Sequence, residues 1–384
     1  MQFKNISKYI IFFLILFANV NNVLSKNEIS NIKPSRINLH NITKQGDSLF
    51  SSDGPIIVYE NDVIKSYEVI PYDNIFKSFK RTISKSDELK CYVDETKQSF
   101  SFWLKDTIKT EKSVYDLPDR MFIISDIEGN FKGFQSILTG SGVIDTEFNW
   151  TFGKGHLVFV GDMFDRSLNV TECLWLLYKL EDVAEKKGGK VHFILGNHEV
   201  MNLKSDYRYV RRKYFINADS LKLEYGKWYD QNTELGRWLR SKNCIEKIGD
   251  IIFVHGGISK DLPLGEMTLD EINFNFRSRI DLKLTKEEMR SDVYIGRESP
   301  IWYRGIAENK MEQGDMDNIL KQVDAKKIII GHTIFDEINF LYDGKVIAID
   351  LEHRENTEKG FMKGLLFESN GFFIIDDKGF KKSL

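Results

Sequence analysis

Apolar runs that end in polar clusters recur along the chain from about residue 120. They read RMFIISDIEGN, HLVFVGDMFDRS, KVHFILGNHEVMN, DIIFVHGGIS and AKKIIIGHTIF. Each contains an apolar core of the length of a buried strand, and segments with helical periodicity, such as VTECLWLLYKLEDVAEK, lie between some of them. Strands that alternate with helices predict a layered α/β fold in which helices cover the sheet.

The polar clusters lie at the same end of each predicted strand. Ligands of open α/β sheets bind beyond the carboxyl ends of the strands, so we expect these side chains to converge on one site. In the first cluster, Asp126 and Glu128 stand one residue apart, and the alternation of a strand directs both to the same side. The candidate site residues at the strand ends are Asp126, Glu128, Asp162, Asp165, Asn197, His198, His255 and His332.

The first 118 residues predict other kinds of structure. Residues 1–25 combine a short basic start, the apolar stretch YIIFFLILFANV and a cleavage region near Ser25, which together are typical of a signal peptide. The stretch is shorter than the roughly 20 residues of a membrane span, so cleavage and export to a periplasm or the exterior are expected rather than a stable anchor. Residues 26–50 predict a flexible linker, and residues 51–118, with two hairpin-like units, predict a β-rich elaboration. The main domain then spans residues 119–384.

Composition narrows the possible partners. The net charge is −3, and it becomes −5 when Lys4 and Lys8 leave with the signal peptide. This charge does not indicate the strongly basic surface that proteins usually use to bind nucleic acid. The three cysteines, Cys91, Cys173 and Cys244, are widely separated; one disulfide is possible, and the sequence does not select the pair. Nothing in the sequence indicates the oligomeric state.

The candidate residues form a characteristic donor set. Carboxylates, imidazoles and an amide oxygen suit divalent ions such as Mn, Fe, Zn or Mg better than a soft, thiolate-bound ion. Any one histidine here is more simply explained as a core or turn residue, but three of them together with carboxylates favour a metal site. More than five candidate ligands indicate two ions that share a carboxylate.

The ordered motifs SDIEGN, GDMFDRS, GNHE, HGG and GHT resemble those of the calcineurin-like metallophosphoesterases. GNHE and HGG are similar to the phosphoprotein phosphatase branch, and SPIWYRG at 299–305 is similar to a motif of its Shewanella-like group and bacterial metallophosphatases. The resemblance covers residues 119–378. It implies a four-layer α/β/β/α sandwich, two divalent metal ions with Mn favoured, and hydrolysis of a phosphorylated substrate.

The resemblance also implies roles for individual residues. One aspartate would bridge the two ions, two carboxylates would complete the first site, and an asparagine and two histidines would complete the second. In chain order, these six metal ligands are Asp126, Glu128, Asp162, Asn197, His255 and His332, with Asp162 as the bridge. Paired cations of this kind activate a nucleophile and clamp an in-line displacement.

Four further residues would carry out the reaction. His198 would protonate the leaving oxygen, oriented by Asp165, while Arg166 and Arg304 would hold the phosphoryl oxygens. Simpler interpretations remain open: Asp165 could cap a helix with Arg166 as its surface ion-pair partner, and Arg304 could be a solvated residue. Glu199 is interpreted as structural.

Two positions depart from the family pattern. Glu128 stands where the family usually has His, and Ser167 replaces the usual Gly after the Asp-Arg pair. The extra carboxylate predicts a preference for Mn or Mg over Zn or Fe. His353, in AIDLEHREN, lies past another strand end and could approach the metals.

The segment DYRYVRRKYF, residues 206–215, has two interpretations. It could contact an anionic or aromatic substrate group near the mouth of the site, or it could be a helix with a solvated basic face and an apolar core face. Three functions follow from the whole sequence: an exported phosphatase for monoesters of protein or small molecules, a hydrolase of dinucleoside polyphosphates or other phosphoanhydrides, and a non-catalytic metal-containing binding module. Intact His198, Asp165 and Arg166 argue against the third.

Overall fold

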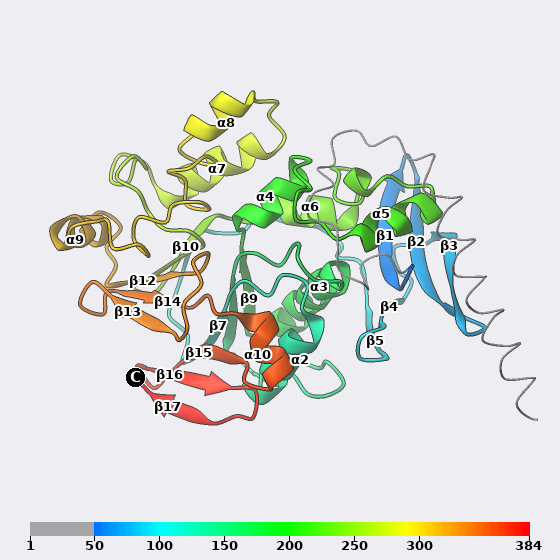
Figure 1. Ribbon diagram of the computed structural model, residues 1–384, viewed down its shortest axis with the longest axis horizontal. Helices are drawn as coiled ribbons and strands as arrows, with labels where there is room; N and C mark the ends of the chain where they lie inside the picture. The colour runs from blue at the N-terminus through cyan, green and yellow to red at the C-terminus, as the bar shows by residue number, and fades with distance from the viewer. Residues whose placement is uncertain (1–49) are drawn as a thin grey trace, which may run out of the picture. The chain divides into compact units, whose positions relative to one another are not determined.

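The computed structural model describes residues 50–384, which form two six-stranded sheets, two small antiparallel sheets and the helices around them (Figure 1). The predicted signal peptide at 1–25 lies outside the described residues, as does all of the predicted linker at 26–50 except Phe50. None of the helices within residues 50–384 has the length and hydropathy that a membrane crossing requires.

The predicted hairpins between residues 51 and 118 are present, and they carry one additional strand. The five strands are β1 (Asp53–Glu60), β2 (Val63–Tyr72), β3 (Ile75–Ile83), β4 (Leu89–Val93) and β5 (Gln98–Phe102). β1, β2 and β3 form one antiparallel sheet, and β4 and β5 form the other. The sequence did not predict β3, because most of its residues are exposed or partly exposed and its apolar positions do not alternate regularly.

The first large sheet has three parallel strands at one side. Its order is β17-β16-β15-β7-β8-β9, and β7, β8 and β9 run parallel. The C-terminal strands extend it in antiparallel pairing. The bounds are β7 (Arg120–Ile124), β8 (His156–Val160), β9 (Lys190–Ile194), β15 (Lys363–Glu368), β16 (Gly371–Asp376) and β17 (Lys381–Ser383).

The second large sheet has the order β13-β14-β12-β11-β10-β6, with β11, β12 and β14 parallel. The register places Ile330 of β12 opposite Ala348 of β14. Residues that follow these two strands therefore leave the sheet side by side. The bounds are β6 (Val114–Tyr115), β10 (Ile245–Ile248), β11 (Ile251–Val254), β12 (Lys327–Ile330), β13 (Asn339–Leu341) and β14 (Val346–Ala348).

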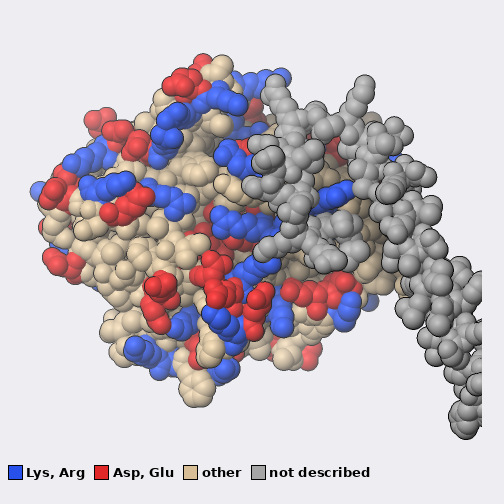
Figure 2. Space-filling model, in the orientation of Figure 1, with Lys and Arg blue, Asp and Glu red and all other residues tan. Residues whose placement is uncertain are grey.

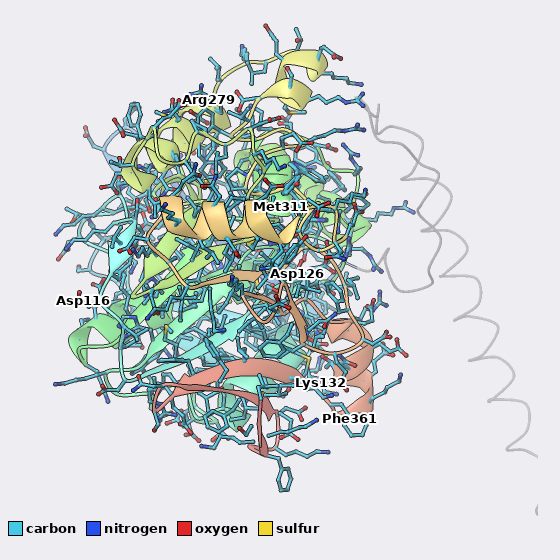
Figure 3. All side chains as sticks on the ribbon, turned by 90° about the vertical axis from the view of Figure 1, so that its left-hand side faces the viewer. Asp116, Asp126, Lys132, Arg279, Met311 and Phe361 are labelled. Carbon is cyan, nitrogen blue, oxygen red and sulfur yellow. The ribbon has the colours of Figure 1, made fainter. Side chains whose placement is uncertain are left out.

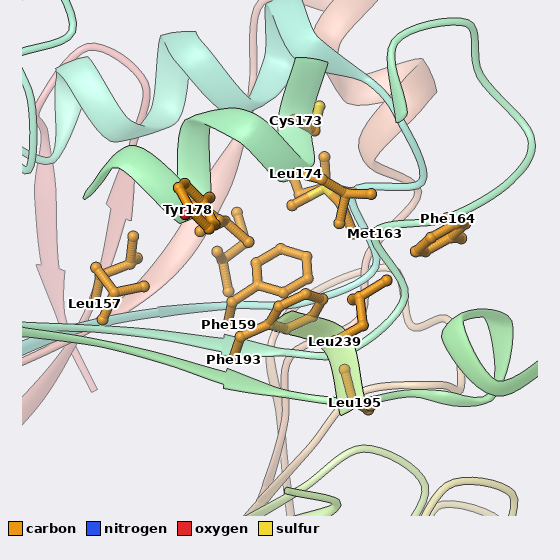
Figure 4. Packing of buried hydrophobic residues seen from close by; sticks show 14 of the residues in the cluster. Leu157, Phe159, Met163, Phe164, Cys173, Leu174, Tyr178, Phe193, Leu195 and Leu239 are labelled. Atoms are coloured by element: carbon orange, nitrogen blue, oxygen red, sulfur yellow. The ribbon is translucent and has the colours of Figure 1, made fainter. Parts of the chain in front are cut away.

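An apolar layer joins the two large sheets face to face. Alternate residues of β7, Met121 and Ile123, pack in one cluster with Ile329 and Ile347 of the second sheet. Their neighbours point the other way, toward α2 (Phe131–Gly140) and α3 (Val170–Lys186), which cover the outer face. Figure 4 shows residues of α3, among them Leu174, above Phe159 and Phe193 of the strands.

Helices also cover the second sheet. Apolar residues of α7 and α9 belong to the same core cluster as the outward-facing positions of β11 and β12. The order of layers is therefore α/β/β/α, and the predicted fold class is confirmed. The remaining helices are α4 (Asn197–Leu203), α5 (Arg212–Leu221), the 3-10 helix η3 (Tyr225–Lys227), α6 (Glu234–Arg240), α7 (Leu269–Ile280), α8 (Lys286–Ser291), α9 (Gln313–Gln322) and α10 (His353–Lys359).

The three cysteines are packed in the hydrophobic core. Cys91, Cys173 and Cys244 are all buried and free, so the disulfide that the sequence allowed is not formed in this structure. Burial raises the pKa of the Cys173 thiol well above its ordinary value, which keeps this side chain on α3 neutral.

Charged side chains are mixed over the described part of the face in Figure 2, where small groups of Lys and Arg alternate with groups of Asp and Glu.

Candidate metal and phosphate site

The carboxyl ends of five parallel strands bring the predicted site residues together. The segments directly after β7, β8, β9, β11 and β12 carry all of them except Arg304, which lies between α8 and α9, and Asn197 and His198 form the start of α4. Asp162, from the first sheet, has Oδ2 3.1 Å from His255 Nε2, from the second. The site therefore spans the top of both sheets. Figure 3 shows Asp126, which is 6% exposed, near the middle of the molecule, whereas Phe361, which is 55% exposed, lies lower and to the right.

Asp162 is the centre of the cluster. It belongs to two groups whose potential ligand atoms all lie within 4.8 Å of one another, one with His255 and His332 and the other with Glu128 and His198. The backbone N–H of His332 donates to Asp126 Oδ2 at 3.1 Å, which ties the end of β12 to the end of β7.

The histidines at the strand ends present nitrogen atoms that suit a cation. His255 Nδ1 lies 2.8 Å from the carbonyl of Val160, which fixes Nδ1 as the donor and leaves Nε2 facing Asp162 and, at 3.1 Å, Asn197 Oδ1. His332 is 5% exposed, and within residues 50–384 its Nε2 has no hydrogen-bond partner. A buried imidazole nitrogen without a partner is costly unless something binds it.

Two carboxylates of the cluster, Asp126 and Glu128, are poorly compensated by the protein itself, whereas His255 and His198 lower the pKa of the buried Asp162. Burial, together with Asp162, raises the pKa of Asp126 to about 6, although His255 opposes the shift. Burial raises the pKa of Glu128 to about 8 even though Arg166 and His198 lower it. A divalent cation would stabilise these charged groups, so the donor set, the crowded carboxylates and the orphaned nitrogen all fit bound metal.

Asp350 is a site residue that the sequence analysis missed. It follows β14 and is 2% exposed, and β14 pairs in parallel with β12, the strand that precedes His332. Burial raises its pKa well above the ordinary value, and the charges of Asp126 and Glu128 raise it further. The sequence did carry the necessary pattern, because VIAID is another apolar run that ends in a carboxylate.

The neighbouring His353 does not join the cluster. It is buried at the start of α10, and within the described chain neither ring nitrogen has a hydrogen-bond partner. Burial alone lowers its pKa to about 4, and no charged group of the site shifts that pKa. The predicted approach of His353 to the metal ligands finds no support in these contacts.

His198 is held as a proton donor would have to be. Its Nδ1 lies 2.6 Å from Asp165 Oδ2, and Asn202 Nδ2 donates to the other oxygen of Asp165 at 3.0 Å. Its Nε2 lies 3.8 Å from Asp162 Oδ2, on the side of the candidate metal ligands. Burial disfavours the imidazolium, but Asp162 and Asp165 more than offset it and raise the pKa of His198 to about 9. Asp165 is not a helix cap, because the N-cap of α3 is Asn169.

The two arginines lie at the rim. The Arg166 side chain is 44% exposed and forms an ion pair with Glu128 rather than with Asp165. Arg304 Nη1 donates to the carbonyl of His332 at 2.6 Å and to Thr333 Oγ1 at 2.8 Å. Both guanidinium groups are therefore next to candidate metal ligands, as phosphate recognition would require.

The sequence profile of the calcineurin-like phosphoesterases matches residues 120–335, which is more than half of the chain and includes every residue of this site except Asp350. The chain belongs to the calcineurin-like phosphoesterase family.

Known relatives agree with this assignment. The chain is 26% identical over 303 residues to Shewanella-like protein phosphatase 2 of Arabidopsis thaliana, covering 65% of this chain and 74% of that protein. It is 29% identical over 243 residues to Shewanella-like protein phosphatase 1 of Plasmodium berghei, covering 59% and 66%. A crystal structure of the cold-active protein-tyrosine phosphatase of a psychrophilic Shewanella species superposes with a TM-score of 0.77 at 31% identity, covering 87% and 99%.

Glu199 of this phosphoesterase connects two loops of the site through hydrogen bonds. Its carboxylate accepts hydrogen bonds from the backbone N–H groups of Asp162, Met163, Phe164 and Gly196, at 2.7 to 3.2 Å. These bonds join the loop after β8 to the loop after β9. Glu199 therefore fixes the distance between Asp162 and the start of α4.

Backbone conformation explains the Gly and Asp content of the phosphoesterase motifs. A Cβ on Gly196 would lie 2.2 Å from Asp162 Oδ1, and a Cβ on Gly331 would lie 2.5 Å from Asp126 Oδ2, so neither position accepts a side chain. Left-handed backbone, which is uncommon outside glycine, occurs at six of the predicted site residues: Asp126, Glu128, Asp162, Asp165, Arg166 and His332. Strained backbone of this kind is often concentrated at functional sites.

Proposed function

We propose that this protein is an exported, metal-dependent phosphatase that hydrolyses phosphate monoesters of protein, phosphotyrosine included, or of small molecules. The proposal rests mainly on one contact, of 2.6 Å, between His198 Nδ1 and Asp165 Oδ2. This contact lies directly beside the cluster centred on Asp162. The names of the relatives, which are protein phosphatases and a protein-tyrosine phosphatase, support the substrate class.

The residues of the chain would bind, orient and transfer a proton. Arg166 and Arg304 would hold phosphoryl oxygens through paired N–H donors. Asp165 keeps Nδ1 of His198 engaged, so Nε2 is the atom that gives its proton to the leaving oxygen. Two divalent ions, with manganese favoured, would be held by Asp126, Glu128, Asp162, Asn197, His255 and His332 and would supply charge neutralisation and activation of the attacking water.

A substrate panel tests the proposed activity. We expect turnover of p-nitrophenyl phosphate and of a phosphotyrosine peptide in manganese buffer, loss of turnover after chelation, and recovery when manganese returns. Diadenosine tetraphosphate and bis-p-nitrophenyl phosphate serve as the anhydride and diester comparisons. Turnover confined to the tetraphosphate would replace this proposal with a phosphoanhydride hydrolase, and metal binding without any turnover would indicate a binding module.

Export is tested separately. The basic start and short apolar stretch of residues 1–25 support removal of a signal peptide near Ser25. We expect protein recovered outside the cytosol to begin near Lys26, as measured by intact mass. Recovered protein that still begins with Met1 would contradict the proposal.

A further inference from the structure

The loop between α4 and α5 places an exposed aromatic side chain on the candidate proton donor. Tyr209 is 40% exposed, and its ring centroid lies 5.2 Å from that of the buried His198, with 35° between the ring planes. The guanidinium of Arg166 lies 5.7 Å from the same centroid. Tyr209 therefore adjoins both a group that would protonate the leaving oxygen and a group that would hold the phosphoryl oxygens.

Hydrogen bonds fix the loop in this position. The N–H of Arg166 donates to the carbonyl of Tyr209 at 3.3 Å, and Arg211 Nη1 donates to the carbonyl of Arg166 at 2.7 Å. At the start of the loop, the N–H of Asp206 donates to the carbonyl of Met201 at 2.8 Å. The main chain of the loop is thus held at Tyr209 and at both of its ends, so the ring projects from a fixed position.

The reaction itself determines what lies next to Tyr209. A general acid must be within hydrogen-bond reach of the leaving oxygen, so the group bonded to that oxygen lies beside His198. Because the Tyr209 ring packs on His198 and is still exposed, the leaving group would meet this ring. A flat aromatic leaving group would bury area and gain ring–ring attraction there, whereas a short alkyl group would gain little.

We propose that Tyr209 is a specificity-determining residue that packs against aromatic leaving groups and makes the protein favour aryl phosphates, such as phosphotyrosine, over alkyl phosphates, such as phosphothreonine. This inference rests on the proposed phosphatase activity. Residues 206–215, for which the sequence allowed either a contact with the substrate or a helix with a basic face, divide into two parts. Residues 206–211 are a loop at the site, whereas α5 begins at Arg212 and buries Lys213 and Tyr214.

The test compares Tyr209→Ala, Tyr209→Leu and Tyr209→Phe on two peptides that differ only in carrying phosphotyrosine or phosphothreonine. A ring–ring contact is worth a factor of about 2–10, so we expect the ratio of kcat/KM for phosphotyrosine to that for phosphothreonine to fall by this factor in the alanine and leucine variants. The phenylalanine variant should keep the ratio of the unmodified protein. An equal loss on both peptides would show that Tyr209 only positions His198, and an unchanged ratio would overturn the proposal.

Binding provides a readout that does not depend on turnover. Calorimetric titration with benzylphosphonate and propylphosphonate should show the same selective loss of affinity for the aromatic ligand in the alanine variant. Tyr72→Ala, which removes a tyrosine that is 49% exposed on β2, is the matched control. It should change neither the ratio of kcat/KM for the two peptides nor the ratio of affinities for the two phosphonates. If the unmodified protein hydrolyses neither peptide nor p-nitrophenyl phosphate, the proposed activity fails, while equal phosphonate affinities in Tyr209→Ala and unmodified protein would reject the role of Tyr209 by itself.

Discussion

Replacing His198 with alanine is expected to lower turnover by on the order of 10²–10⁴ while the two proposed metal ions stay bound. The reason is its hydrogen bonding. Nδ1 is engaged by Asp165 at 2.6 Å, and Asn202 holds that carboxylate in turn, so the ring is fixed with Nε2 left as the atom that can give a proton. Loss of the imidazole removes the proton donor and leaves the other candidate ligands in place.

The competing interpretation for His198 is direct metal ligation, since it shares one cluster with Glu128 and Asp162. Elemental analysis of the purified variant decides between the two roles, because a ligand variant would lose one ion per chain. His156→Ala is a suitable control: it removes a half-buried imidazole from the first position of β8, at the opposite end of the strand from Asp162. Its metal content and turnover should stay close to those of the unmodified protein.

The sequence predicted the layered fold because the information is local. Each apolar run is a short strand whose polar residues follow directly, and parallel pairing then brings Asp126, Asp162 and Asn197 to one edge. Pairing within β7, β8 and β9 does not depend on which loop side chains meet. The strand β3 was missed for the converse reason, since it is held by pairing with β2 and its own sequence is mostly exposed.

Contacts between loops could not be predicted in this way. The ion pair of Arg166 with Glu128 and the packing of Tyr209 on His198 join segments whose relative placement depends on loop conformation, not on periodicity. Asp350 shows a different limit. AIDLEHREN follows a strand end, but attention to imidazoles as ligands selected His353. In the structure the buried Asp350 is the residue that interacts electrostatically with Asp126 and Glu128.

Removing Glu128 is expected to release one of the two proposed metal ions and to lower turnover by on the order of 10–100-fold or more. Changing even the outer partners of a metal site produces a loss of this size. Glu128 shares the Asp162 cluster, and its raised pKa of about 8 shows that the protein alone does not compensate its charge. Glu128→Gln is the matched variant, because it keeps the shape and one oxygen donor but removes the charge.

The structure also supplies the strongest alternative, since Glu128 forms an ion pair with Arg166. If holding Arg166 were its only task, Glu128→Ala would keep both ions and raise KM as Arg166→Ala does, and the double variant would be no worse than either single one. Glu128→His separates the two roles further. A neutral nitrogen donor in place of a carboxylate should shift the metal retained from an equimolar mixture away from Mn and toward Zn or Fe, because imidazole suits the latter ions better. A counterion of Arg166 would leave the retained metal unchanged, so metal content measured across these variants assigns Glu128 to one role or the other.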